Sequence, residues 1–189
     1  MSYYNKNAEN FFKSTVDADM SEIYIKFEKY LKNGCHIVDI GCGSGRDSKY
    51  FKNKGYIVTA TDLSEELSTL ASKSINQKVL IEDILHMDRE EDFDAAWACA
   101  SLLHINKENI ITALKNVYKA LKENGIFYAS FKYGEVETEK DGRIFNNYTE
   151  KTLKELLLKT EFKVKEIWIT GDVRQGRESE KWINVIVQK

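Results

Sequence analysis

The feature that most constrains the fold is a short glycine-rich turn, D-I-G-C-G-S-G, at residues 39–45. An apolar run precedes this turn, and a segment with helical spacing, residues 44–54, follows it. Alternating glycines let the chain reverse sharply and let a ligand approach the backbone, because glycine has no Cβ. The N-terminus of the following helix directs free N–H groups and partial positive charge to the same place. The pattern predicts a strand, a tight turn and a helix, the opening of a nucleotide-binding α/β unit.

A second apolar run, residues 56–61, also ends in an acid, Asp62. A carboxylate at the tip of the second strand is placed to accept hydrogen bonds from both hydroxyls of a ribose. The glycine spacing differs from the G-x-G-x-x-G fingerprint of dinucleotide-binding proteins, because an acid precedes three alternating glycines. This difference disfavours an NAD-dependent oxidoreductase. The acids at two strand tips disfavour a glycine turn that binds nothing.

The rest of the chain alternates between strand and helix patterns. We expect strands at 36–41, 57–62, 79–83, 93–98, 125–132, 164–170 and 182–188, and helices at 7–14, 18–32, 44–54, 64–75, 107–122 and 149–160. This alternation predicts an α/β fold: a doubly wound, mostly parallel seven-stranded sheet with helices on both faces, closed by an antiparallel C-terminal hairpin. At 189 residues the chain is expected to be a single domain, 1–189, with an N-terminal helical lid region at 1–33.

Several motifs resemble those of the class I S-adenosylmethionine-dependent methyltransferases, with a Rossmann-like fold. The glycine turn with T-A-T-D at 59–62 resembles their first two motifs, and V-L-I-E-D-I at 79–84 resembles the third. F-D-A-A-W-A-C-A-S-L-L-H at 93–104 resembles the fourth. L-K-E-N-G at 121–125 resembles the turn before the fifth strand, without its usual proline. The resemblance covers residues 30–132 and is nearest to small bacterial methyltransferases of the tellurite-resistance and type 11 groups.

This resemblance implies S-adenosylmethionine as cofactor and methyl transfer to a small-molecule acceptor. It places the cofactor against Tyr4, Asp39, Gly41, Cys42, Gly43, Ser44, Gly45, Arg46, Asp62, Leu63, Asp83, Ile84 and Ala98. The acceptor and the number of subunits are not encoded in any motif.

Two aromatic or titratable features near the expected site have two interpretations each. His104 follows the fourth strand and is either a general base or substrate contact, or a histidine held by a backbone partner. An aromatic cluster near the start of the chain either covers the cofactor and excludes water, or packs as an amphipathic helix on the sheet; it consists of Tyr3, Tyr4, Phe11 and Phe12.

Basic residues in the second half of the chain form a third candidate group. The expected substrate residues are Lys132, Tyr133, Arg143, Arg174 and Arg177, which this fold brings to one rim. A cationic rim favours an anionic substrate. The alternative is that nearby acids pair with these cations in solvated loops.

Composition limits the remaining classes of function. The net charge of −2 gives no general attraction to nucleic acid or membrane, and no apolar stretch approaches the length of about 18 residues that spans a bilayer. No secretion signal opens the chain, so we expect a cytoplasmic protein. Its three cysteines and three histidines have no metal-site spacing, so no metal is expected. Cys99 is interpreted as a core or pocket-wall residue.

Rival functions remain within and outside this class of enzyme. A tRNA or protein methyltransferase is disfavoured because no basic domain is appended. The absence of proline also excludes two proline-containing motifs of nucleic-acid methylation. A non-catalytic subunit that binds S-adenosylmethionine would carry the same glycine turn and the same Asp62.

Overall fold

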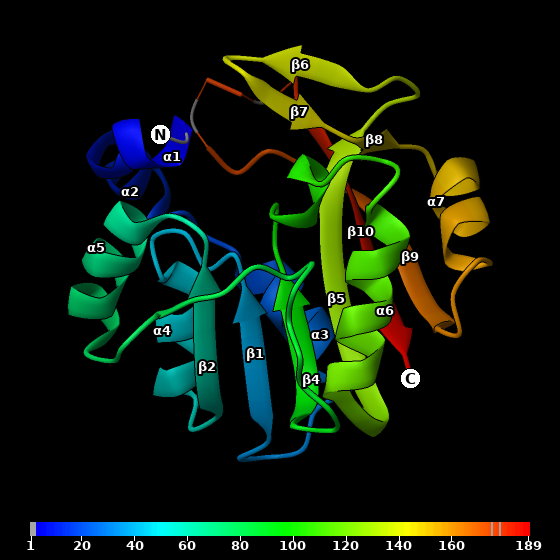
Figure 1. Cartoon of the computed structure of the whole chain (residues 1–189), viewed down its shortest axis with the longest axis horizontal. Coiled ribbons are helices and arrows are strands. Elements are labelled where there is room, and N and C mark those ends of the chain that lie inside the picture. Colours follow the sequence, from blue (N-terminus) through cyan, green and yellow to red (C-terminus); the bar gives the residue numbers. More distant parts are fainter. Residues whose placement is uncertain (1–2, 175, 178) are drawn as a thin grey trace.

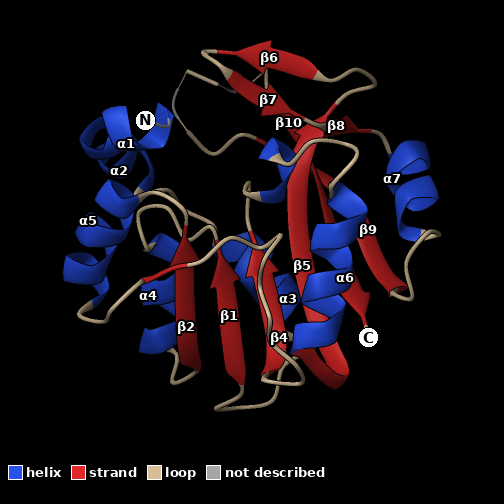
Figure 2. Cartoon of the chain, viewed as in Figure 1, coloured by secondary structure: helices blue, strands red, loops and turns tan. Residues whose placement is uncertain are grey.

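The computed structural model describes residues 3–174, 176–177 and 179–189, and it is built around one twisted sheet (Figures 1 and 2). Five parallel strands form most of it: β1 (His36–Ile40), β2 (Ile57–Asp62), β3 (Leu80–Ile81), β4 (Phe93–Ala98) and β5 (Leu121–Tyr133). Their order is β3-β2-β1-β4-β5. The chain runs outward from β1 to β3 and then returns to place β4 on the other side of β1. This reversal creates a crevice at the carboxyl ends of β1 and β4.

The C-terminal strands close the sheet as the sequence predicts. β10 (Lys181–Gln188) inserts between β5 and β9 (Lys163–Gly171) and is antiparallel to both. A two-residue strand, β8 (Asn147–Tyr148), adds to the upper end of β5. A separate hairpin, β6 (Thr138–Lys140) with β7 (Arg143–Phe145), lies above the carboxyl end of β5 (Figure 1). The sequence analysis missed β6, β7 and β8, since these strands are short and rich in polar residues.

Helices cover both faces of the sheet. In Figure 1, α6 (Ile110–Ala120) lies in front of the sheet and α3 (Ser21–Glu28) behind it. The front layer also contains α7 (Glu150–Leu157) and the three-residue 3-10 helix η1 (Leu102–His104). The rear layer includes α4 (Arg46–Asn53) and α5 (Glu65–Ile75). Two N-terminal helices, α1 (Tyr3–Lys6) and α2 (Ala8–Thr15), lie beside the start of α5.

Local signals in the sequence explain where several helices begin and end. Ser64 caps α5 by accepting the Leu67 N–H, and Thr149 caps α7 through a reciprocal pair with Thr152. The helix expected at 18–32 is shorter than predicted. After Glu28 the hydrogen bonds change to the i→i−3 type, at Tyr30 and Leu31, so the chain leaves the α-helical path before residue 32.

Strand alternation divides the core into a front and a rear layer. On β4, Phe93, Ala96 and Ala98 face the front helices, whereas Ala95 and Trp97 face the rear helices. The rear layer is rich in aromatic side chains: Phe27 of α3 packs against Phe51, Trp97 and Tyr128, with ring centroids 5.0 to 6.2 Å apart. These rings fix the rear helices beneath the crevice. No helix in the described part of the chain is both long and apolar enough to cross a membrane.

We expect Phe27→Ala to destabilise the protein by about 3–5 kcal/mol, because Phe27 is fully buried and its removal leaves a cavity among rigid rings. Ile25→Ala on the same helix is the matched control. Ile25 is 57% exposed, so its replacement should change the free energy of unfolding by less than about 0.5 kcal/mol. Denaturant unfolding of both variants measures this difference. Equal losses would show that α3 does not anchor the core.

Candidate active site

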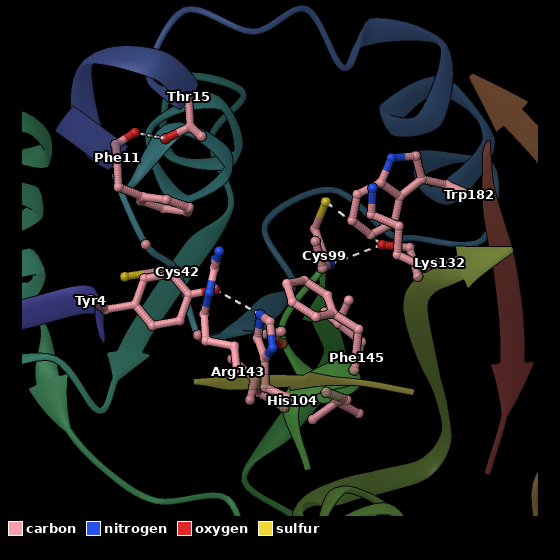
Figure 3. A pocket seen from close by; sticks show the side chains of 18 of the residues that line it. Tyr4, Phe11, Thr15, Cys42, Cys99, His104, Lys132, Arg143, Phe145 and Trp182 are labelled. Carbon is pink, nitrogen blue, oxygen red and sulfur yellow. Dashed lines mark hydrogen bonds between the residues drawn. The ribbon is translucent and has the colours of Figure 1, made fainter. Parts of the chain in front are cut away.

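A cavity of about 1240 Å³ opens at the carboxyl ends of the central strands (Figure 3). Its floor is the glycine turn after β1 and the tips of β2 and β4. Tyr3, Tyr4 and Phe11 line it from the N-terminal helices, and Arg143 and Phe145 line it from the β6–β7 hairpin. The volume exceeds the usual range for a site that holds one drug-sized ligand, so it has room for two small molecules at once.

The three glycines of the turn all adopt positive φ, at +69° for Gly41, +56° for Gly43 and +75° for Gly45. Side chains at these positions would also be crowded. A Cβ on Gly41 would lie 2.6 Å from the Cβ of Ser101, and one on Gly45 would lie 2.8 Å from Ile75. The turn therefore requires glycine for its conformation and for its close contacts with β4 and α5.

Asp62 lies at the tip of β2 and joins two segments of the cavity floor. Its carboxylate accepts the Gly43 N–H at 2.9 Å and the Ser64 N–H at 2.8 Å. Burial raises the pKa of Asp62, and the two N–H donors oppose that rise. Each oxygen keeps a further lone pair, so Asp62 still has the capacity to accept hydrogen bonds from a ligand in the cavity.

Beneath the turn lies a buried polar cluster centred on Asp47. The Asp47 carboxylate accepts hydrogen bonds from the Tyr24 hydroxyl at 2.5 Å and the Trp97 indole at 2.8 Å. The Arg46 guanidinium donates two more, at 2.6 and 2.9 Å. Burial opposes ionisation of Asp47, but Arg46 and the other donors hold the pKa of that carboxyl below its usual range.

Asp39 has a different environment from Asp47, although the two residues are close in sequence. It is buried, and the Ser48 hydroxyl donates to it at 2.6 Å. Burial, and then the charge of Asp47, raises the pKa of Asp39 to about 8. Asp39 thus stabilises the turn from below as a largely protonated group near neutral pH.

The cavity collects most of the residues expected to bind the cofactor. Those that line it are Tyr4, Gly41, Cys42, Gly43, Ser44, Arg46, Asp62, Leu63, Asp83 and Ile84. Asp39, Gly45 and Ala98 do not line it: Asp39 and Ala98 are buried in the layers beneath, and Gly45 packs against α5. Tyr3 of the N-terminal aromatic cluster and Ser101, beyond the tip of the fourth expected strand, also line the cavity. Asp47 lines it as well and was not predicted; it follows Arg46 directly, so only the folded geometry reveals its place.

His104 is joined to the N-terminal helix α1. Its Nδ1 lies 2.7 Å from the carbonyl oxygen of Ile144, and its Nε2 lies 2.7 Å from the hydroxyl of Tyr4 (Figure 3). A carbonyl only accepts, so Nδ1 carries the proton and Nε2 accepts the Tyr4 hydroxyl. Burial lowers the pKa of His104, which keeps the ring neutral. His104 therefore has the backbone partner that one interpretation required, and it also faces the cavity as the other required.

The expected cationic rim is largely neutralised by neighbouring acids. Lys132 pairs with Glu180, Arg174 pairs with the buried Asp172 at 2.5 Å, and Arg177 lies 3.7 Å from Glu180. All of these cations line the cavity, as does Tyr133, whose hydroxyl donates to Glu150. These ion pairs support the alternative in which nearby acids neutralise the three cations.

Arg143 differs from the other cations. It is 17% exposed, and its carboxylate partner, Asp141, is half-exposed and 3.5 Å away. The guanidinium lies over the ring of Tyr3, 3.6 Å from the centroid, and 5.1 Å from that of Phe145. Its buried Nε has no hydrogen-bond partner among the described residues.

Cys99 also lines the cavity, as the pocket-wall interpretation predicts. Burial raises the pKa of its thiol to about 12, so the thiol stays protonated and is a poor nucleophile. The described residues contain no group of three or more His, Cys, Asp or Glu side chains arranged to hold a metal ion.

Comparison with known proteins explains the arrangement of turn, acids and cavity. A family model described as a methyltransferase domain matches residues 37–125, from β1 to the turn within β5. Residues 37–125 are a methyltransferase domain. The family that the sequence motifs resembled is thereby confirmed for this part of the chain, and the glycine turn and Asp62 lie within it.

Two curated relatives carry the same domain. YqeM of Bacillus subtilis (strain 168), named as a methyltransferase, is 32% identical over 144 residues, covering 66% of this chain and 57% of its own length. TehB of Haemophilus influenzae (strain 10810), named as an S-adenosyl-L-methionine-dependent methyltransferase, is 27% identical over 96 residues, covering 48% of this chain and 34% of its own. The chain thus spans between a third and three-fifths of these relatives.

A solved structure shows that the fold extends beyond the domain match. The 1,6-didemethyltoxoflavin-N1-methyltransferase of Burkholderia thailandensis superposes with a TM-score of 0.81 at 22% identity, over 98% of this chain and 84% of its own. That structure contains bound 1,6-didemethyltoxoflavin and S-adenosylhomocysteine. The methyltransferase domain of the present chain thus has the Rossmann-like sheet predicted from its sequence.

The raised pKa of Asp39 predicts a pH dependence of stability. The native state retains a proton that the unfolded chain releases between pH about 4 and 8, so stability should fall as pH rises through that window, by at most about 1.4 kcal/mol per pH unit. Asp39→Asn cannot ionise and should flatten the profile of the free energy of unfolding against pH. Asp88→Asn, at an exposed carboxyl, is the control and should leave the slope unchanged. Parallel profiles for wild type and Asp39→Asn would refute this assignment.

Proposed function

We propose that the chain is a cytoplasmic S-adenosylmethionine-dependent methyltransferase that acts on a small molecule. The observation that carries the proposal is the pairing of the glycine turn with Asp62 on the floor of a cavity large enough for two ligands. Three free cysteines fit a reducing compartment.

The residues on the cavity floor fit a bound nucleoside. Gly43 leaves its backbone open toward the cavity, and a Cβ there would approach the Phe11 ring at 3.1 Å. Asp62 has the lone pairs to accept both ribose hydroxyls. Two cavity-lining residues, Glu82 and Ser101, each have a buried oxygen, Oε2 and Oγ, without a hydrogen-bond partner among the described residues. A polar ligand along the tips of β1 to β4 would satisfy these atoms.

S-adenosylmethionine supplies a methyl group on a positively charged sulfur, which is a good leaving group. The chain's own contribution is therefore to position two reactants and to exclude water. The cofactor would lie over the turn, near Asp62 and Asp83, and the acceptor would lie toward His104 and Arg143. Residues 3–15 of the N-terminal region 1–33 would form the cover, with Tyr4 and Phe11 facing inward; Met1 and Ser2 lie outside the described residues.

The acceptor is proposed to be small because the described rim cations are paired with acids, which weakens the attraction of the cavity mouth for nucleic acid. Among these cations, Arg143 best supports an anionic acceptor, since it is mostly buried and its Nε has no hydrogen-bond partner among the described residues.

Calorimetric titration with S-adenosylhomocysteine, S-adenosylmethionine, NAD and ATP tests the proposal. We expect binding of the first two ligands and none of comparable strength for NAD or ATP. Binding of NAD in their place would support the oxidoreductase. Tight S-adenosylmethionine binding with no turnover of any acceptor would support the non-catalytic subunit.

Asp62→Ala should weaken S-adenosylhomocysteine binding by about 1.5–3 kcal/mol, because the change removes a charged acceptor from the ribose. Asp62 also holds the Gly43 and Ser64 N–H groups, so the melting temperature without ligand must be measured alongside. Glu65→Ala is the matched control, since Glu65 is an exposed acid at the start of α5. The Glu65→Ala protein should bind S-adenosylhomocysteine with wild-type affinity. Unchanged affinity in a folded Asp62→Ala protein would place the ribose elsewhere.

A further inference from the structure

Both ring nitrogens of His104 are already hydrogen-bonded within the protein, so neither is free to contact the methyl acceptor directly. Its Nδ1 donates to the Ile144 carbonyl and its Nε2 accepts from Tyr4, each at 2.7 Å. A base that contacts the acceptor itself would need Nε2 to be free. Tyr4, which lines the cavity, is the last member of the hydrogen-bonded series Ile144–His104–Tyr4, so its hydroxyl oxygen is the atom nearest to a bound methyl acceptor (Figure 3).

The Tyr4 oxygen is equipped to pass on a proton. It donates its own proton to His104 and accepts a long hydrogen bond from Arg143 NH1 at 3.5 Å, which leaves one lone pair for a ligand. A bound acceptor that donates an O–H or N–H to this oxygen would complete a three-member chain, from acceptor to Tyr4 to His104. The ring of His104 is neutral and its second nitrogen is held by a backbone carbonyl, so it has both the lone pair and the orientation of a base.

We propose that Tyr4 relays the acceptor's proton to His104, and that the acceptor is a molecule with a weakly acidic O–H or N–H. The inference rests on the proposed methyl transfer. A thiolate or an already ionised oxyanion would need no such relay, whereas a protonated oxygen or ring nitrogen must lose its proton as it is methylated.

The step balances in atoms and charge. The acceptor atom forms a bond to the methyl carbon with its lone pair, and the pair of the broken carbon–sulfur bond stays on the sulfur of S-adenosylmethionine. The acceptor's proton passes to the Tyr4 oxygen while the Tyr4 proton passes to His104 Nε2. Tyr4 ends neutral and His104 ends as an imidazolium, which returns its proton to water after the product leaves.

Arg143 serves the same step electrostatically. Its buried guanidinium, near the Tyr4 oxygen and short of hydrogen-bond partners, would stabilise negative charge that develops on the acceptor before the methyl bond is complete. It also disfavours a charged His104 in the resting protein. The relay therefore begins from neutral His104 and neutral Tyr4.

The relay couples chemistry to closure of the N-terminal segment. Tyr4 belongs to α1, at the start of the chain, whereas His104 follows β4 and Arg143 lies on β7. When α1 is displaced, His104 loses its link to the acceptor. Proton removal would thus be available only when the cover that excludes water is in place.

The resting state can be tested without knowing the acceptor. In the full chain with S-adenosylhomocysteine, nitrogen NMR should show His104 neutral and protonated on Nδ1 at neutral pH. Tyr4→Phe removes the donor to Nε2 and should raise the pKa of His104. Tyr118→Phe, a tyrosine of α6 outside the cavity lining, is the control and should leave that pKa near the wild-type value. The groups that face the pair are Tyr3 of α1, Asp62 of β2 and Arg143 of β7, with Asp141 beside Arg143. A charged ring, or no response to Tyr4→Phe, would contradict the relay.

Turnover tests the acceptor class. A screen with labelled S-adenosylmethionine should methylate phenols, enols or ring N–H heterocycles, and not thiols or inorganic oxyanions. With the best acceptor, Tyr4→Phe should lower kcat by about 10²-fold or more, while Tyr118→Phe, on α6 and outside the cavity lining, stays within a few-fold of wild type. In wild type, kcat should fall as pH falls through the lowered pKa of His104, and His104→Gln should lose that limb of the profile. If S-adenosylhomocysteine fails to bind, the proposed function fails. If it binds but no O–H or N–H acceptor is methylated, or if Tyr4→Phe keeps full kcat, only the relay fails.

Discussion

The buried carboxylate of Asp47 is the interaction on which the rest of the structure depends. It accepts hydrogen bonds from Tyr24 on α3 and Trp97 on β4, and it pairs with Arg46 at the start of α4. One charge thereby fixes a rear helix, a central strand and the exit of the glycine turn in one geometry. A buried pair of this kind is costly to break, because the Tyr24 hydroxyl and the Trp97 indole would each lose a buried acceptor. The cavity floor is rigid since this cluster lies directly beneath it.

The sequence predicted the parts of this molecule that repeat a physical rule. Strand and helix periodicity located the main sheet, and Ser64 and Thr149 marked the helix starts where they occur. The turn at 39–45 and Asp62 were recognisable because only glycine and a strand-tip acid suit those places. The β6–β7 hairpin could not be predicted, because β6 is exposed, β7 is half-buried along its whole length, and neither strand alternates between buried and exposed residues.

Side-chain partners were the less predictable part of the site. Asp39, at the head of the most informative motif, supports the turn from below instead of lining the cavity. Four cations looked equivalent in the sequence, yet the Arg143 guanidinium lies over aromatic rings, and its buried Nε has no hydrogen-bond partner among the described residues. Lys132, Arg174 and Arg177 pair instead with Asp172 or Glu180. The Tyr4–His104 hydrogen bond joins residues 100 positions apart, and no local pattern encodes it. This bond joins two roles that the sequence treated separately: Tyr4 as a cover over the cofactor and His104 as a base.

In the proposed arrangement, the glycine turn and Asp62 hold the nucleoside of a methyl donor while Tyr4 closes over it toward His104. A crystal structure of the full chain with S-adenosylhomocysteine tests this arrangement. The ribose hydroxyls should lie on the Asp62 carboxylate and the sulfur should face the Tyr4–His104 pair, with the hydrogen bond of that pair intact. A ribose bound away from Asp62, or a sulfur turned from His104, would contradict it.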